Sequence, residues 1–198
     1  MKKLIGLLLL AAVSMPQIFA AGVSRGTSDT VSNFGMVTEG IYRGGRPTGE
    51  PAYKYLADLG VKTVVNLQYM HTDDKALCKK YGLNCVDFKL FASAPPADYI
   101  MDWDKFKQAY AFVLDEKSAG RKVFFHCLYG SDRTGMLAAT IKMRESACGS
   151  PSVDKDKLWE QTQTVLKECN FHKVFGDYTR HMKEMVYKFE DNRSWICK

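Results

Sequence analysis

The segment from His126 to Gly135 constrains the fold more than any other part of the chain. It reads His-Cys-Leu-Tyr-Gly-Ser-Asp-Arg-Thr-Gly. Before it, residues 121–125 form a short run that is typical of a buried strand, and after it we expect a helix from about Arg133 to Glu145. A strand, a tight turn with glycine and a helix can direct several backbone N–H groups at one anion beside the positive helix end. The segment therefore predicts an anion site at the carboxyl end of a strand.

Two side chains of this segment predict covalent phosphate chemistry. The helix end and the backbone amides stabilise the thiolate form of Cys127, and the thiolate is the nucleophile. Arg133 provides a planar fork that can hold two phosphoryl oxygens and stabilise their charge during transfer. Thr134 is suited to donate its hydroxyl to the thiolate, which makes the sulfur a better leaving group. The alternative for Cys127 is a buried core cysteine at the end of a strand.

The other residues of the segment are expected to shape the anion site. Gly130 lets the backbone bend close to the phosphate oxygens, and Tyr129 can line the mouth. His126 either tunes the thiolate or fills the core. The loop has no lysine and contains Asp132, which disfavours polyphosphorylated inositols relative to a phosphate monoester. The expected phosphate-binding residues are Leu128, Tyr129, Gly130, Ser131, Asp132 and Arg133.

Strand patterns alternate with helix patterns along the chain up to this loop. Strands are expected at Val37–Tyr42, Val61–Leu67, Asn84–Phe88 and Arg121–Phe125. Helices are expected at about Gly49–Leu59, Asp73–Tyr81, Asp102–Lys117, Arg133–Glu145, Asp154–Lys167 and Gly176–Glu190. The alternation predicts the α/β class, with a central, mostly parallel, twisted sheet of about four to five strands flanked by helices.

The first twenty residues have the pattern of a signal peptide. Two lysines precede an apolar stretch that is short for a membrane span, and Ala20 is a small residue before the expected cut. We expect residues 21–33 to be a flexible N-terminal arm and residues 34–198 to be a single domain. The mature chain would carry a net charge of +4, because the leader removes two lysines and no acidic residue.

The cysteines and histidines indicate disulfides rather than a metal site. All six cysteines follow Ala20, none forms a C-x-x-C pair, and the four histidines are scattered. Antiparallel packing of the last two helices would bring Cys197 toward Cys148. Cys78 at a helix end and Cys85 at the next strand start could also pair, which leaves Cys169 as the odd cysteine. We expect an exported protein, periplasmic or secreted, with no metal and no cofactor.

Two motifs carry a family resemblance. His126-Cys127-x5-Arg133-Thr134-Gly135 resembles the signature of the protein tyrosine phosphatase superfamily, in particular its small dual-specificity-like members. Residues 42–47, Tyr-Arg-Gly-Gly-Arg-Pro, with the helix and strand that follow, resemble the opening of the atypical dual-specificity phosphatases of plants, fungi and bacteria. The resemblance spans roughly residues 41–144. It implies the cysteine-phosphatase fold and hydrolysis of phosphate monoesters through a thiophosphate-enzyme intermediate.

The resemblance also implies an aspartate general acid on a loop about thirty residues before the cysteine. Asp98, 29 positions before Cys127, has the right loop context. Asp132 is an alternative, because some superfamily members carry an aspartate at this place in the loop. Asp102 and Asp104 fit better as acids in the first turn of a helix.

The expected substrate is a phosphorylated protein, small molecule or lipid, with phosphotyrosine among the possibilities, and no nucleic acid is expected as a partner. We expect a monomer without stable membrane insertion once the leader is removed. A phosphate-recognition module without turnover is the main alternative. Arsenate reductases and low-molecular-weight phosphatases are disfavoured, because their loop lies near the chain start.

Overall fold

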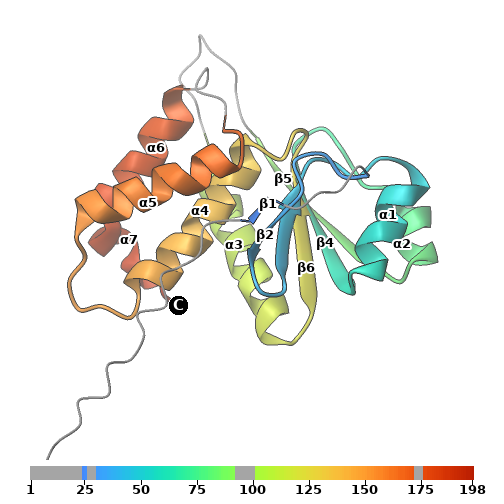
Figure 1. The fold of residues 1–198 in the computed structure, drawn as a ribbon, viewed down its shortest axis with the longest axis horizontal. Helices are drawn as coiled ribbons and strands as arrows, with labels where there is room; N and C mark the ends of the chain where they lie inside the picture. The colour runs from blue at the N-terminus through green and yellow to red at the C-terminus, as the bar shows by residue number, and fades with distance from the viewer. Residues whose placement is uncertain (1–23, 26–29, 92–100, 172–175) are drawn as a thin grey trace, which may run out of the picture.

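The computed structural model describes residues 24–25, 30–91, 101–171 and 176–198, and its elements are labelled in Figure 1. The strands are β1 (Ser24–Arg25), β2 (Gly35–Thr38), β3 (Ile41–Gly44), β4 (Val61–Gln68), β5 (Asn84–Leu90) and β6 (Lys122–His126). The helices are α1 (Gly49–Asp58), α2 (Lys75–Lys80), α3 (Trp103–Ser118), α4 (Asp132–Ala147), α5 (Lys155–Glu168), α6 (Gly176–Tyr187) and α7 (Phe189–Ile196). No helix in these described ranges is long and apolar enough to cross a membrane.

The strands form one sheet in the order β1-β2-β3-β6-β4-β5. β3, β6, β4 and β5 run parallel, whereas β1 and β2 join through antiparallel pairs. The predicted α/β class and the mostly parallel sheet are confirmed. The predicted single edge strand at 37–42 is wrong, because the chain turns at Gly40, which has a φ of 79°, and forms the hairpin of β2 and β3.

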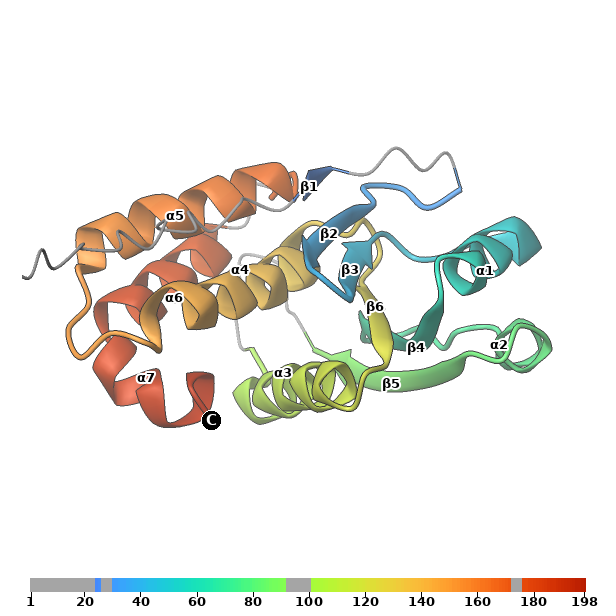
Figure 2. The same ribbon diagram turned by 60° about the horizontal axis from the view of Figure 1, so that its bottom comes forward.

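Helices cover both faces of the sheet (Figure 2). Successive side chains of a strand point to opposite faces, so Val123 and Phe125 of β6 join one core and Phe124 joins the other. The larger core contains α3 and α4, and the smaller core contains α1 and Cys78 of α2. The sheet thus lies in the middle layer, with β6 buried between β3 and β4.

Helix α4 is buried along most of its length, because α5, α6 and α7 pack around the side that faces away from the sheet (Figure 2). The predicted helix at 176–190 is interrupted. Lys188, with φ −102° and ψ 30°, separates α6 from α7 and lets the chain turn back along α4. Tyr110 Oη and Arg144 Nη1 both donate to the carbonyl of Ile196, at 2.5 and 2.7 Å, and fix the end of α7.

The structure contains both expected disulfides. Cys148–Cys197 joins the end of α4 to the end of α7 across 49 residues, and Cys78–Cys85 joins α2 to β5. Both pairings are confirmed. Cys127 and Cys169 are buried thiols.

Residues 30–33 differ from the flexible arm expected over 21–33. Val31 is fully buried in the smaller core, and Asn33 adopts a left-handed φ of 50°, a conformation that asparagine tolerates. Earlier in the same range, β1 pairs with β2. These residues belong to the domain because their apolar and hydrogen-bonding groups find partners there. The predicted signal peptide, residues 1–20, lies outside the described residues.

Glycines allow the turn after β3 to contact the loop after β6. Arg46 N–H donates to the carbonyl of Leu128 at 3.1 Å. Gly130 has a φ of 71°, and a Cβ atom there would lie 2.3 Å from the carbonyl carbon of Gly44. Glycine is required at position 130 for both its backbone conformation and the close approach of Gly44.

Gly130→Ala therefore combines backbone strain with a collision, whereas Gly120→Ala adds strain alone. Gly120 has a similar φ of 74°, but no heavy atom lies within 4 Å of an added Cβ. We expect Gly120→Ala to lower the free energy of unfolding by about 1 kcal/mol, and Gly130→Ala to lower it by about 3 kcal/mol because overpacking is added. Denaturant unfolding of the two variants measures the difference, and equal losses would contradict the close approach.

Candidate active site

The loop from Cys127 to Ser131 connects the centre of the sheet to the N-terminus of α4. β6 ends at His126, and α4 begins at Asp132. The Cys127 side chain is only 3% exposed at this junction. A helix N-terminus carries unpaired N–H groups and a partial positive charge, so the loop offers the expected environment for an anion and a thiolate.

Arg133 is anchored at the same edge of the sheet. Its Nη1 donates to the carbonyl of Leu67 at 3.4 Å and to the carbonyl of Leu90 at 3.3 Å, near the ends of β4 and β5. Both bonds use one nitrogen, so they do not occupy the Nε and Nη2 donors. The sheet therefore positions the guanidinium in the first turn of α4 while these other N–H groups can bind an anion.

Thr134 is fully buried in the first turn of α4. The sequence predicts a hydrogen bond from its hydroxyl to the Cys127 sulfur, but Oγ1 has no hydrogen-bond partner among the described residues. The predicted bond is therefore not formed in this structure. A buried hydroxyl without a partner is energetically unfavourable, which gives Thr134 a reason to donate when an acceptor forms beside it.

The structure describes three of the four possible general acids. Asp98 lies outside the described residues. Asp132 is the first residue of α4, half-buried beside the loop. Asp102 caps α3, since its Oδ1 accepts from the N–H of Lys105 at 3.0 Å, and this bond holds the pKa of Asp102 below its ordinary value. Asp102 is thus the N-cap of α3 rather than a residue of its first turn, and Asp104 lies in the first turn as expected.

A buried polar pair supports the loop from behind. Asn33 Nδ2 donates to the carbonyl of Gly130 at 2.9 Å and to that of Cys169 at 2.8 Å. Arg43, which is fully buried in β3, donates to Asn33 Oδ1 at 2.8 Å and to the carbonyl of Glu168 at 2.9 Å. The pair thus ties the loop to β3 and to the end of α5. Sequence reasoning missed both residues, although an arginine inside a buried strand was a usable signal.

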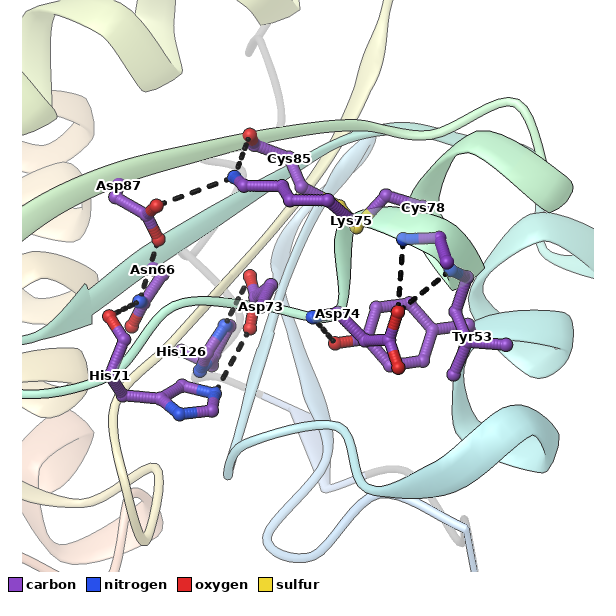
Figure 3. Close-up of a disulfide and its surroundings, with 12 residues drawn as sticks. Tyr53, Asn66, His71, Asp73, Asp74, Lys75, Cys78, Cys85, Asp87 and His126 are labelled. Atoms are coloured by element: carbon purple, nitrogen blue, oxygen red, sulfur yellow. Dashed lines mark hydrogen bonds and ion pairs between the residues drawn. A yellow bond between two sulfur atoms is a disulfide. The ribbon is translucent and has the colours of Figure 1, made fainter.

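A second polar pair lies directly before the nucleophile (Figure 3). His126 Nε2 is 3.1 Å from Asp73 Oδ2, and both side chains are fully buried. Burial, the largest influence, raises the pKa of Asp73, but the hydrogen bond and charge of His126 outweigh it, so the pKa lies below its ordinary value. The residues alone left the role of His126 open, although the family resemblance implies that it tunes the thiolate through hydrogen bonds behind the loop. Asp73 was expected only as the start of a helix, because nothing local indicated that the two residues meet.

Aromatic side chains lie exposed around the same edge of the sheet. Tyr129 in the loop is 63% exposed, Tyr69 just after β4 is 44% exposed, and Phe91 just after β5 is 42% exposed. The rings of Tyr69 and Phe91 form an edge-to-face pair with centroids 5.1 Å apart. The carbonyls that bind Arg133 belong to residues one or two positions before this pair, so the aromatic pair borders the anion site.

The described residues contain no group of three or more His, Cys, Asp and Glu side chains that could hold a metal ion. The reactive groups that the loop and its surroundings offer are a thiol, an arginine and backbone N–H groups. These groups suit nucleophilic attack on a phosphoryl centre and stabilisation of the charge that develops there.

Comparison with curated proteins shows distant relatives over most of the chain. The inositol diphosphatase DSP4 of Arabidopsis thaliana is 25% identical over 146 residues, which cover 72% of this chain and 71% of the relative. The inositol diphosphatase DSP1 of Oryza sativa subsp. japonica is 25% identical over 145 residues, covering 72% of this chain and 64% of the relative.

Solved structures share the fold at lower sequence identity. The catalytic core of the PP-IP phosphatase Siw14 from S. cerevisiae superposes with a TM-score of 0.59 at 16% identity, covering 85% of this chain and 97% of that one. TpbA of P. aeruginosa superposes with a TM-score of 0.53 at 19% identity, covering 82% of this chain and 96% of that one. A TpbA variant has been crystallised in complex with pTyr.

The family comparison agrees with the loop and with the fold. The model of the tyrosine phosphatase family matches residues 30–146, which is more than half of the chain and includes both Asn33 and the whole loop. The chain belongs to the tyrosine phosphatase family and is a phosphoric monoester hydrolase of the protein tyrosine phosphatase type.

Proposed function

We propose that this protein is an exported phosphatase that hydrolyses phosphotyrosine-like monoesters through a thiophosphate-enzyme intermediate at Cys127. The observation that carries the proposal is the geometry of the loop. A buried thiol directly follows β6, and the sheet anchors Arg133 in the first turn of α4. Phosphate would bind to the backbone N–H groups of residues 128–133 and to the guanidinium of Arg133.

The proposed reaction has two steps. The thiolate of Cys127 attacks phosphorus, the bond from phosphorus to the ester oxygen breaks, and a carboxylic acid gives its proton to the leaving oxygen. Water then attacks the phosphorus, the phosphorus–sulfur bond breaks, and phosphate leaves as the thiolate re-forms. The deprotonated carboxylate accepts the proton of this water. In the second step, the buried hydroxyl of Thr134 would donate to the departing sulfur, which provides the acceptor that it lacks in this structure.

Asp98 is the proposed proton donor, and Asp132 is the alternative. The argument for Asp98 is its position 29 residues before Cys127 in a loop-type sequence, which matches what the family resemblance implies. Asp132 is the first residue of α4, directly before Arg133. A carboxylate at a helix N-terminus also has a purely structural role.

Asp98→Asn is therefore expected to lower kcat for an aryl phosphate by about 10²-fold or more, and Cys127→Ser to abolish turnover. Asp132→Asn should have a smaller effect. Steady-state hydrolysis of a chromogenic aryl phosphate by the mature protein measures all three variants.

Asp104→Asn is the matched control, because it removes a carboxylate from the first turn of α3 without touching the loop. Loss of activity in Asp132→Asn with little loss in Asp98→Asn would reverse the acid assignment. A wild-type protein that binds phosphate analogues without turnover dependent on Cys127 would identify a recognition module instead.

The surroundings of the loop favour an aryl phosphate as substrate. Within the loop, Arg133 is the only basic residue of positions 127–135 and Asp132 adds a negative charge, which suits one phosphate better than several. The exposed rings of Tyr129, Tyr69 and Phe91 can contact the aromatic ring of a phosphotyrosine. The relatives named for inositol diphosphates point the other way, whereas the TpbA variant was crystallised with pTyr.

Tyr69→Ala is expected to raise KM for a phosphotyrosine peptide about fivefold, because one aromatic contact contributes about 1 kcal/mol. KM for a small alkyl phosphate should stay unchanged. Tyr187→Ala is the control, since this tyrosine has a similar exposure but lies on α6. Wild-type protein that prefers inositol diphosphates over phosphotyrosine peptides in kcat/KM would overturn the proposed substrate class.

Export is supported by the leader pattern and by the cysteines. Both disulfides lie after the expected cleavage site, and structural disulfides persist mainly in oxidising compartments. We expect the protein in the periplasm or the medium, with an N-terminus at Ala21 by mass spectrometry. Recovery from the cytoplasm with residues 1–20 attached and Cys148 reduced would contradict export.

A further inference from the structure

The hydrogen-bond partners of His126 determine the charge of its ring. Nδ1 is 3.3 Å from the carbonyl oxygen of Cys127, and Nε2 is 3.1 Å from Oδ2 of Asp73. A carbonyl oxygen and a carboxylate oxygen both accept hydrogen bonds, whereas a neutral imidazole has only one N–H. Both contacts are hydrogen bonds at the same time only when each ring nitrogen carries a hydrogen. The geometry therefore favours an imidazolium paired with a carboxylate.

The complete burial of both side chains makes an unpaired charge on either of them energetically costly. The side chains of His126 and Asp73 are both fully buried, and a buried charge is tolerated only beside an opposite charge. The ring of Phe124 stacks on His126 with centroids 5.8 Å apart. Among the described residues, the other ionisable groups that interact with Asp73 are His71, Lys75 and Tyr53, and His71 also interacts with His126.

His71 lies on the other side of Asp73, with Nε2 3.5 Å from Oδ1. Burial, followed by the charge of Arg46, lowers the pKa of His71, so at neutral pH this second histidine is mainly neutral. Of the two histidines beside Asp73, His126 is the one whose ring contacts favour the charged form.

The segment that carries Asp73 is fixed on several sides (Figure 3). Asn66 Nδ2 donates to the carbonyl of His71 at 2.8 Å, and the N–H of Asp74 donates to Tyr53 Oη at 3.0 Å. The Asp74 carboxylate then caps α2, and the disulfide from Cys78 to Cys85 ties α2 to β5. Asp73 therefore meets His126 without having to order a loose loop first, which lowers the entropy cost of the pair.

We propose that Asp73 is a positioning residue that holds His126 as an imidazolium behind Cys127 and thereby favours the thiolate. The charge lies one residue before the nucleophile, in a dry environment where electrostatic interactions are strong. The ring's Nδ1–H bond also fixes the carbonyl of Cys127 and so the direction of the loop. The proposal rests on the proposed function of Cys127 as nucleophile and adds a residue from a distant segment to its control.

Asp73→Asn separates charge from geometry. The amide can donate to Nε2 of a neutral ring whose Nδ1–H still bonds to the carbonyl of Cys127, so the hydrogen-bond chain is kept while both charges are removed. The test measures the rate of alkylation of Cys127 by iodoacetamide against pH. Mass spectrometry of the Cys127 peptide distinguishes it from Cys169, the other thiol. We expect the pH at half-maximal rate to rise by about one unit, a tenfold loss of reactive thiolate at low pH.

Asp74→Asn is the matched control, because asparagine still caps α2 while the adjacent charge is lost. Its alkylation profile should match that of the wild type. An unchanged profile for Asp73→Asn would overturn the proposal, because removing the charge of an Asp73 with a purely structural role would leave the thiolate unaffected. Alkylation requires no turnover, so the result is independent of whether Cys127 hydrolyses phosphate esters.

A measurement on the wild-type protein keeps the test decisive if Asp73→Asn does not fold. Nitrogen NMR of the histidine rings reports whether each ring nitrogen carries a hydrogen. We expect the His126 ring to show two N–H groups at pH 7. A singly protonated His126 ring at that pH would overturn the proposal.

Discussion

The contact between the turn after β3 and the loop after β6 underlies the geometry of the whole site. It is possible only because Gly130 has no side chain, since a Cβ would collide with the backbone of Gly44. On the inner side of the contact, Arg43 and Asn33 satisfy the polar backbone groups that such close packing buries. A buried arginine is costly without hydrogen-bond acceptors, and Asn33 and the carbonyl of Glu168 provide them here, so this region tolerates few alternative arrangements. The loop is thereby held in the anion-binding shape before any phosphate arrives.

The rest of the molecule supports this loop from two sides of the sheet. On one face, α4 is buried by α5, α6 and α7, and the disulfide from Cys148 to Cys197 closes this layer. On the other face, the disulfide from Cys78 to Cys85 fixes the helix that follows Asp73. Four of the six cysteines thus form structural disulfides, whereas Cys127 remains a thiol and is 3% exposed. Burial limits the access of oxidants to this cysteine, which the proposed export would place in an oxidising compartment.

Sequence reasoning predicted the features that depend on neighbours along the chain. The run before His126, the turn at Gly130 and the helix after Arg133 are local patterns, and the structure has all three. Both disulfide pairings were also predicted. Cys78 and Cys85 lie at the end of one element and the start of the next, and antiparallel packing of the last helices was expected to bring Cys197 toward Cys148. The breaks at Gly40 and Lys188 were missed, since in both places a continuous apolar pattern hid a turn. Asn33 and Asp73 were missed because their partners lie 97 and 53 positions away, and no periodicity reports such pairs.

The proposed mechanism requires Cys127 to form a covalent bond to phosphorus during turnover. Rapid acid quenching during hydrolysis of an aryl phosphate, followed by mass spectrometry of the digested protein, tests this claim most directly. The proposed mechanism predicts one phosphoryl group on the peptide that contains Cys127, and none on the same peptide of Cys127→Ala. Rapid turnover in which every peptide stays unmodified, or a phosphoryl group on another residue, would contradict it.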